Sequence, residues 1–287
     1  EVDVGNGDLT IVRAGRVLMS NDVFVSGTLS QATGLDNTRF EKEVSAAEIN
    51  LRANNQIRFG GGVTLLSGDL TLITNNIDFR GGNTSVVGAL SDSGQSISNA
   101  YFRPISPAGE MNIGSPLGAG SNFTFSATDI AALQNGWNAI VFGYATGSTN
   151  LARIGGATFL DAVTVYAGSM LVNGSLAART SLTLDAATGN MSFTNGALTS
   201  VVNEQVANVW QESFIEMTAH QGDILFSNGA FVRVNNTANP GTGTPASAIT
   251  MTATQGQIRD QSAAPGFQEA RNMHLTAAGD IFLYTRA

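Results

Sequence analysis

The stretch from Ile215 to Phe226 reads I-E-M-T-A-H-Q-G-D-I-L-F, and the chain restates this phrase several times. Further copies read L-T-L-D-A-A-T-G-N-M-S-F from Leu182 to Phe193, I-T-M-T-A-T-Q-G-Q-I-R-D from Ile249 to Asp260, and M-H-L-T-A-A-G-D-I-F-L from Met273 to Leu283. Another copy, I-N-L-R-A-N-N-Q-I-R-F, begins at Ile49. Each contains two short runs in which apolar and polar residues alternate, which predicts two strands with one buried face each.

A small residue and a turn separate the two strands of each copy. The turn residue is Gly189, Gly222, Gly256, Gly279 or Asn55, the residue types that suit a corner whose backbone visits positive φ. Successive copies start about 20 to 35 residues apart, near the period of solenoids and related repeat architectures. The repeat therefore predicts an all-β fold, a parallel β-helix (β-solenoid) with loop insertions, as a single domain over residues 1–287.

Stacking of successive copies predicts specific neighbours. One turn of the coil should take about 20 to 25 residues and rise about 4.8 Å, the spacing of hydrogen-bonded strands. Met217 is then expected near Met251 and Leu184, and Phe226 near Phe193.

Four stretches interrupt the repeat and are expected to be loop excursions. They cover about 33–48, 91–122, 203–213 and 235–247, where charged residues, prolines or small polar residues are concentrated. Such loops on a regular scaffold are also where a binding surface is most often placed.

Composition narrows the classes of function. Charged residues make up 13% of the chain, the formal net charge is −8, and cysteine is absent. An acidic chain without a cluster of basic residues is poorly suited to bind the phosphate backbone of a nucleic acid, so no nucleic-acid partner is expected. The absence of cysteine excludes disulfides and thiolate metal sites, and no apolar run is long enough for a transmembrane helix. The chain begins at Glu1, which fits either a removed signal peptide or a fragment.

The segment from Phe123 to Leu176 adds one helical turn to the strand pattern. Thr128 and Asp129 precede I-A-A-L-Q, and Asn135-Gly136 follows, which predicts a short capped helix. Four strands are expected after it, at 139–142, 151–154, 162–166 and 170–172.

This segment resembles repeats of large bacterial surface proteins of the filamentous-haemagglutinin type. The resemblance rests on D-I-A-A-L-Q-N-G-W-N-A-I-V-F-G-Y-A-T-G from Asp129, A-T-F-L-D-A-V-T-V-Y-A-G from Ala157, and V-N-G-S-L from Val172. It implies a secreted, right-handed parallel β-helix used for adhesion or as a stalk. Its motifs specify a scaffold and transfer no catalytic or binding residue.

The residues that could carry chemistry are few. His220 and His274 occupy different positions of the repeated phrase, so stacking should not bring them together, and we interpret them as solvated or satisfied rather than as a metal or catalytic pair. No H-E-x-x-H, G-x-S-x-G or phosphate-loop motif is present. We therefore predict no catalytic, cofactor-binding or metal-binding residue.

Four Gly-Asp corners invite a calcium hypothesis: Gly7-Asp8, Gly68-Asp69, Gly222-Asp223 and Gly279-Asp280. Calcium β-rolls use a denser tandem nonapeptide, so we interpret these aspartates as hydrogen-bonded turn residues. Calcium binding stays open where loops bring carboxylates together.

Alternation also sorts the aromatic residues. Inward positions are predicted for four phenylalanines that would form a core ladder: Phe142, Phe159, Phe193 and Phe226. Trp137, Tyr144 and Tyr166 are the better candidates for exposure.

These observations favour a non-catalytic structural or adhesive module of a secreted bacterial cell-surface protein, outside the cell. It is expected to self-associate into a filament or layer, or to continue a longer solenoid, and its targets could include surface glycans or a host surface. The alternative is a polysaccharide lyase or hydrolase on the same fold, which would need clustered carboxylates. Stacking could align Asp185, Glu216 and Asp223 for that purpose.

Overall fold

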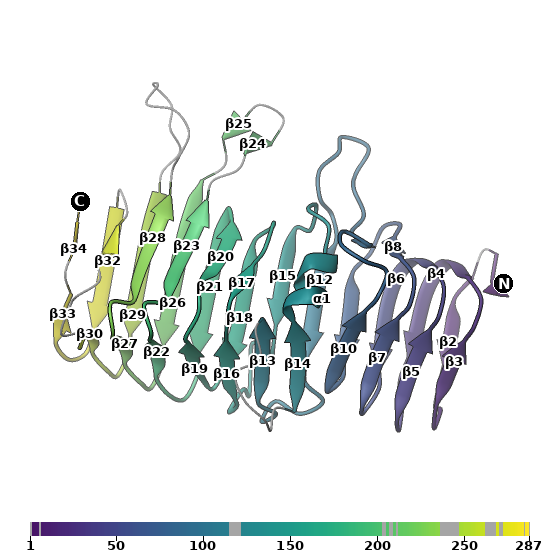
Figure 1. Ribbon diagram of the computed structural model, residues 1–287, viewed down its shortest axis with the longest axis horizontal. Helices are drawn as coiled ribbons and strands as arrows, with labels where there is room; N and C mark the ends of the chain where they lie inside the picture. Colours follow the sequence, from purple (N-terminus) through teal and green to yellow (C-terminus); the bar gives the residue numbers. More distant parts are fainter. Residues whose placement is uncertain are drawn as a thin grey trace. The chain divides into compact units, whose positions relative to one another are not determined.

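Figure 1 shows a computed structural model of the chain, and its secondary structure is almost entirely β. The structure describes residues 2–5, 7–114, 122–202, 205–206, 209–210, 212–235, 247–261, 268–269, 272–283 and 285–286. Within them the only helix is α1 (Ala127–Ala132), which confirms the predicted helical turn. No helix among these residues has the length and apolar character needed to cross a membrane.

The chain divides into two compact units. Unit 1 comprises Glu1–Asn112 and Gly118–Gly143, and unit 2 comprises Ile113–Leu117 and Tyr144–Ala287. Strand β13 (Met111–Gly114) has residues in both units.

Unit 1 contains two parallel sheets, which we call sheets 1 and 2. Sheet 1 includes β1 (Val2–Asp3), β2 (Leu9–Ile11), β4 (Val23–Gln31), β6 (Val44–Arg52), β8 (Val63–Leu65), β9 (Leu70–Ile73), β11 (Val86–Val87), β12 (Asn99–Arg103) and β15 (Ala139–Phe142). Sheet 2 has the order β3 (Val17–Met19), β5 (Asn37–Phe40), β7 (Gln56–Phe59), β10 (Asn76–Phe79) and β14 (Phe123–Ser126). In sheet 1, Leu29 pairs with Ile49 and Ile49 with Leu70, so in-register residues lie 20 and 21 positions apart.

Unit 2 contains three parallel sheets, called sheets 3, 4 and 5. Sheet 3 has the order β18 (Val163–Ala167), β21 (Ser181–Ala186), β26 (Ser213–Ala219), β29 (Ser247–Ala253) and β32 (Asn272–Ala277). Sheet 4 has the order β16 (Leu151–Ile154), β19 (Ser169–Val172), β22 (Met191–Phe193), β27 (Ile224–Phe226), β30 (Ile258–Asp260) and β33 (Ile281–Phe282). Sheet 5 has the order β17 (Ala157–Thr158), β20 (Leu176–Arg179), β23 (Leu198–Val202), β28 (Phe231–Asn235), β31 (Gln268–Glu269) and β34 (Thr285–Arg286).

The chain visits the three sheets of unit 2 in a fixed order, from sheet 4 to sheet 5 to sheet 3, and then returns to sheet 4. We call one such passage a rung, and we use the same word for one passage of the chain through both sheets of unit 1. Each strand pairs in parallel with its equivalent on the next rung, as when Leu184 pairs with Met217 and Met217 with Met251. The stacking predicted for these residues is confirmed, and so is that of Phe193 with Phe226.

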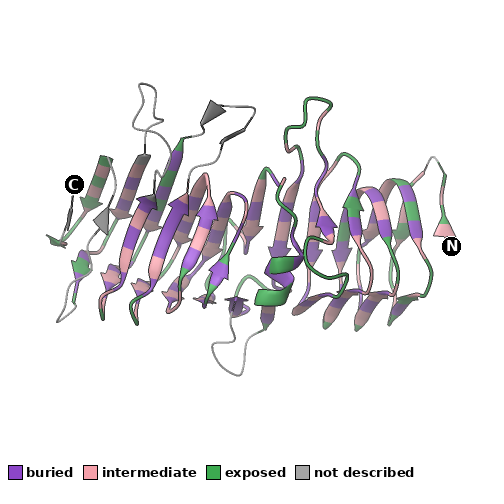
Figure 2. Ribbon diagram, turned by 45° about the horizontal axis from the view of Figure 1, so that its top comes forward, coloured by how far each residue is buried: buried purple, intermediate pink, exposed green. Residues whose placement is uncertain are grey.

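Alternation places one face of most strands in the core, whereas β32 and β33 have no buried residue. Figure 2 shows buried and half-buried residues alternating along the strands, and β26 follows this pattern from Ser213 to Ala219. Its inward residues Ile215 and Met217 are fully buried, while Glu216 between them is exposed. Side chains of equivalent residues therefore form continuous columns through successive rungs.

Phenylalanine columns fill part of both cores. In unit 1, Phe40, Phe59 and Phe79 stack with ring centroids 5.2 and 5.6 Å apart and interplanar angles of 9° and 21°. In unit 2, the rings of Phe193 and Phe226 stack at 4.8 Å. Such offset aromatic pairs add to the free energy gained by burying the rings.

The glycines of the repeated corner are needed for space rather than for positive φ. Gly189, Gly222, Gly256 and Asn55 are absent from the residues with positive φ, so the prediction of a left-handed corner is wrong. A Cβ on Gly222 would overlap the backbone of Gly189, and one on Gly256 would overlap that of Gly222. Stacked backbones approach so closely at this corner that only hydrogen fits.

Two of the expected excursions are wrong in part or whole. Residues 33–48 contain β5 and the start of β6 instead of a loop. Residues 91–122 contain β12 and β13, and 115–121 lie outside the described residues.

The other two expected excursions lie partly outside the described residues. Within 203–213, β24 (Gln205–Val206) and β25 (Val209–Trp210) form a short antiparallel pair, and Ser213 begins β26. The loop expected at 235–247 is bounded by β28 and β29, and 236–246 lie outside the described residues.

Candidate functional site

The outer face of sheet 2 carries ordered columns of polar side chains. Asn37 pairs with Gln56, and Gln56 with Asn76, so three amides stand on neighbouring strands in register. All three side chains are half-buried. Amides carry both donors and acceptors, so this column can bind either type of group.

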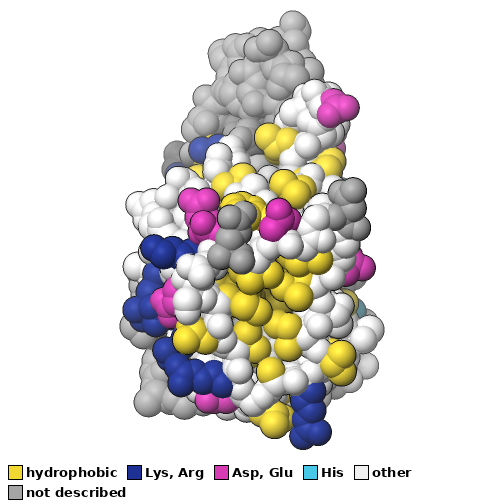
Figure 3. All heavy atoms as spheres, turned by 90° about the vertical axis from the view of Figure 1, so that its right-hand side faces the viewer, with side chains coloured by type: hydrophobic (Ala, Val, Ile, Leu, Met, Phe, Trp, Pro, Cys, Tyr) yellow, Lys and Arg dark blue, Asp and Glu magenta, His cyan; other side chains and the backbone are white. Residues whose placement is uncertain are grey.

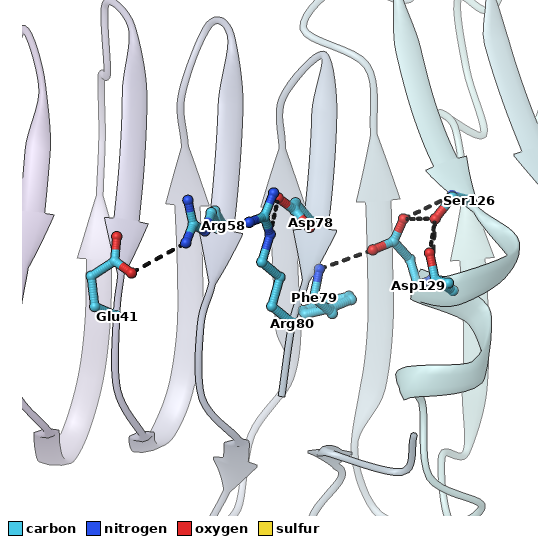
Figure 4. A network of polar contacts seen from close by, with 8 residues as sticks. Glu41, Arg58, Asp78, Phe79, Arg80, Ser126 and Asp129 are labelled. Atoms are coloured by element: carbon cyan, nitrogen blue, oxygen red, sulfur yellow. Dashed lines mark hydrogen bonds and ion pairs between the residues drawn. The ribbon is translucent and has the colours of Figure 1, made fainter. Parts of the chain in front are cut away.

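A charged column runs beside the amides, two residues further along each strand. Arg39 pairs with Arg58, and Arg58 with Asp78. Glu41 Oε2 lies 3.3 Å from Arg58 Nη2, and Asp78 Oδ2 lies 2.8 Å from Arg80 Nε, as Figure 4 shows. The first ion pair joins two rungs, while the second lies within one strand and its corner. Guanidinium groups in such an arrangement favour planar carboxylate-like partners.

Asp129 closes this network at the helix. Its Oδ1 accepts a hydrogen bond of 2.9 Å from the backbone N–H of Phe79, and its Oδ2 accepts one of 2.8 Å from the backbone N–H of Ser126. Ser126 Oγ in turn accepts from the backbone N–H of Asp129, which completes a capping box.

The aspartate takes the place of a strand acceptor. Strands β10 and β14 pair only at Asn76 and Thr124, so the Phe79 N–H at the end of β10 has no carbonyl opposite it in β14. Asp129 supplies the missing oxygen and thereby fastens α1 to β10. The pKa of Asp129 is raised above its ordinary value, mainly because burial disfavours the charged carboxylate. The hydrogen bonds to Ser126 and Phe79 oppose this shift, and the nearby charge of Asp78 adds to it.

The Gly-Asp corners fasten one rung to the next. In three of them the aspartate Oδ1 accepts a 2.7 Å hydrogen bond from a backbone N–H of the following rung, namely Asp8 from Thr28, Asp69 from Asn99 and Asp223 from Gln257. The interpretation of these residues as hydrogen-bonded turn residues is confirmed at those three corners. Across the described residues, no group of three or more His, Cys, Asp or Glu side chains could hold a metal ion, so the calcium hypothesis has no ligand set there.

The two histidines lie in different columns, as predicted. His220 Nε2 lies 3.2 Å from Asp185 Oδ1, and His274 belongs to β32, where it pairs with Thr250. The His220 and Asp185 side chains are 50% and 29% exposed. Glu216 stands on β26 opposite Thr183, so it lies diagonally from Asp185 on the outer face of sheet 3.

That outer face of sheet 3, which we call the threonine face, is polar and nearly uncharged. Its outward residues include Thr164, Tyr166, Thr183, Asp185, Glu216, Thr218, Thr250, Thr252, His274 and Thr276. No lysine or arginine occurs among the outward positions of these five strands. Any formal charge on the face at neutral pH is therefore negative.

The aromatic residues follow the prediction with one exception. The four phenylalanines assigned to the core are buried: Phe142, Phe159, Phe193 and Phe226. Tyr144 and Tyr166 are half-buried. Trp137 is only 3% exposed, so its expected exposure is wrong. A Cβ on Gly88 would lie only 3.2 Å from its ring, which shows how closely the ring approaches that glycine.

The charged network of sheet 2 is the feature that sequence reasoning missed. Its signal is a second, shorter repeat: T-R-F-E at Thr38, I-R-F-G at Ile57 and I-D-F-R at Ile77. The phenylalanine of each copy enters the core, so the residue before it must point outward. Alignment of these three copies would have placed the charges in one column.

Comparison of the chain with protein-family models, with curated proteins and with solved structures gives no match. The resemblance to filamentous-haemagglutinin repeats stays a prediction.

Proposed function

We propose that the chain is a non-catalytic structural or adhesive module of a secreted bacterial surface protein. It is built as a right-handed parallel β-helix whose coil is extended by further rungs, from copies of itself or from a longer solenoid. One observation carries this proposal. The columns of inward-facing apolar side chains continue to the first and last described rungs, where they are only partly covered.

The order of the strands supports a closed coil. In unit 2 the chain returns to each sheet after visiting the other two, and each return adds a parallel neighbour. Parallel crossover connections are right-handed in about 98% of cases, which favours the right-handed form.

The first rung of unit 1 leaves apolar side chains partly uncovered. Leu9 and Met19 are half-buried, although their partners on the next strands, Leu29 and Phe40, are fully buried. Figure 3 shows hydrophobic side chains gathered on this end of unit 1. An apolar surface next to strand edges favours the addition of another strand layer.

The last described rung of unit 2 shows the same feature. Ile224 and Ile258 are fully buried, but Ile281, which pairs with Ile258 in the same column, is 45% exposed. Its neighbour Phe282 is 57% exposed. A further rung packed on β33 would cover Ile281.

Sedimentation velocity over a micromolar concentration series, combined with negative-stain electron microscopy, tests the proposal. The wild-type chain should form concentration-dependent, rod-like assemblies. Replacing both edge residues, Ile281→Lys with Phe282→Lys, should reduce this assembly because it places charge on the apolar edge. The matched control is Leu66→Lys, since Leu66 is 53% exposed in unit 1 and lies apart from the end rungs.

A wild-type chain that sediments as one monomer at every concentration would overturn the self-association. Equal assembly of the edge variant and the Leu66 control would refute the role of the edge. Hydrolysis or eliminative cleavage of a polysaccharide by the purified chain would replace the proposed class with the enzymatic alternative.

A further inference from the structure

Sheet 2 of unit 1 carries an excess of positive charge on its outer face. We call this surface the arginine face; it consists of Arg16, Arg39, Glu41, Arg58, Asp78 and Arg80. It therefore holds four guanidinium groups and two carboxylates, in a chain whose formal net charge is −8. In the end view of Figure 3, Lys and Arg side chains gather along the left flank, which is the side of sheet 2 that faces the viewer in Figure 1.

Internal ion pairs use both carboxylates of this face. Glu41 pairs with Arg58, and Asp78 pairs with Arg80. Within the described residues, Arg39 forms no ion pair, although it stands next to Arg58 in the ladder. Its Nε is buried and has no hydrogen-bond partner among those residues. Two like charges on adjacent strands are unfavourable, so a carboxylate brought to Arg39 from outside would be stabilising.

The threonine face of unit 2 offers carboxylates, although most of its outward residues are uncharged. Glu216 is exposed in the middle of β26, and Asp185 stands diagonally from it on β21. The residues beside Glu216 in its column are Thr183 and Thr250, whose short side chains leave its carboxylate accessible. Both this face and the arginine face are outer faces of parallel sheets, so their strands share the spacing of about 4.8 Å.

We propose that the arginine face of one copy binds the threonine face of a second copy, with Arg39 paired to Glu216. This inference rests on the proposed self-association. We call the end-to-end stacking of rungs the axial contact, and the contact between these two outer faces the lateral contact. Because two different surfaces meet, the contact is heterologous and can repeat from copy to copy without closing. Its charges are partly exposed, so the contact should weaken with salt, whose screening length falls from about 30 Å at 0.01 M to about 3 Å at 1 M.

A charge exchange tests the pairing. The variants are Arg39→Glu, Glu216→Arg and the double variant, each in the full chain, and sedimentation velocity is measured at about 0.01 M and about 1 M salt. Each single change should weaken the low-salt association at least about tenfold, and the double change should restore it because the opposite charges are exchanged. The matched control is Arg153→Glu, a half-buried arginine of β16 on sheet 4 that lies away from β33, and it should leave association unchanged.

Folding is not expected to confuse the result. A carboxylate at position 39 would stand beside Arg58, which replaces a repulsive neighbour with an attractive one. Circular dichroism of each variant checks this directly.

The outcomes separate the lateral contact from the axial one. In one outcome, Arg39→Glu leaves association unchanged while the combined Ile281→Lys and Phe282→Lys variant abolishes it. That result supports the axial contact and overturns the lateral one. Failure of the double variant to restore association also overturns it. If added acidic polysaccharide binds the wild-type chain and not Arg39→Glu, while the chain itself stays monomeric, the arginine face serves a glycan partner and the proposal is wrong.

Discussion

Replacement of Phe59 by alanine is expected to be among the most destabilising single changes in unit 1. The ring is fully buried in β7 and lies between those of Phe40 and Phe79, with centroids 5.2 and 5.6 Å away. Alanine would remove the ring from the middle of a column. The neighbours above and below are held in place by their own strand ladders, so they cannot move together to fill the space.

The magnitude follows from these contacts. A buried Phe→Ala change costs about 3 to 5 kcal/mol, and a site that cannot collapse falls at the upper end of that range. Aromatic pairs contribute about 0.5 to 1.5 kcal/mol each beyond their buried area, and two are lost here. We therefore expect about 5 kcal/mol for Phe59→Ala, and about 2 kcal/mol for Phe59→Leu, which keeps most of the volume and loses mainly the pairs.

Urea unfolding followed by tryptophan fluorescence and circular dichroism measures the change. Trp137 is buried in unit 1 and so reports on that unit. The matched control is Phe24→Ala in β4, because Phe24 points outward and is 38% exposed. A loss of less than about 2 kcal/mol for Phe59→Ala, or a loss equal to that of the control, would contradict the column as a source of stability.

Three further changes test the core, the corners and the helix clamp. Ile224→Asp should cost several kcal/mol because it buries a charge. Thr218→Asp on the outer face should cost far less, about 0.2 to 1 kcal/mol from the like charge of Asp185 opposite it, and equal melting temperatures would contradict the assignment of faces. Gly222→Ala should cost about 3 kcal/mol because its Cβ would overlap stacked backbone, while Gly15→Ala, which meets nothing within 4 Å, should change the urea midpoint little. Burial raises the pKa of Asp129, so its contribution to folding is present below about pH 4 and is lost as pH rises through the raised value. The free energy of unfolding of wild type relative to Asp129→Asn should therefore increase on acidification, and the opposite trend in urea titrations would refute the shift.

Sequence alone predicts the strands and their stacking partners where the inward residues are apolar. Met217 and Met251 belong to phrases that match residue by residue, so their register can be obtained by aligning the copies. The same procedure fails at 33–48, where β5 has only two inward residues, Thr38 and Phe40. Thr38 is polar, and its hydroxyl is satisfied in the core by a 2.7 Å hydrogen bond to Gln31 Oε1, so the apolar alternation of the strand is hidden.

The candidate site depends on register across rungs, which the local pattern does not contain. Glu41 and Arg58 are 17 residues apart, but the backbone partner of Arg58 on β5 is Arg39. Their ion pair therefore depends on where β5 ends and the corner begins. Asp129 is a further case. The sequence predicts a short capped helix at this point, but it identifies neither Ser126 as the N-cap nor the bond to Phe79, 50 residues earlier, which depends on how α1 docks on β10.

The hydrogen bonds at the corners give each rung two chemically different edges. Asn190 Oδ1 accepts from the backbone N–H of Asp223, and Asp223 Oδ1 accepts from that of Gln257, so both steps run from an acceptor side chain to a donor N–H on the following rung. The two edges of a parallel sheet already differ in their pattern of backbone donors and acceptors. The corner side chains add a second difference between the edges, because they too accept hydrogen bonds from the following rung. A rung turned upside down would meet its neighbour with these acceptors and donors out of register. Further rungs added to either unit should therefore have their strands in the same direction as the existing ones. Head-to-tail stacking is the arrangement that forms the hydrogen bonds of both the strand ladders and the corners.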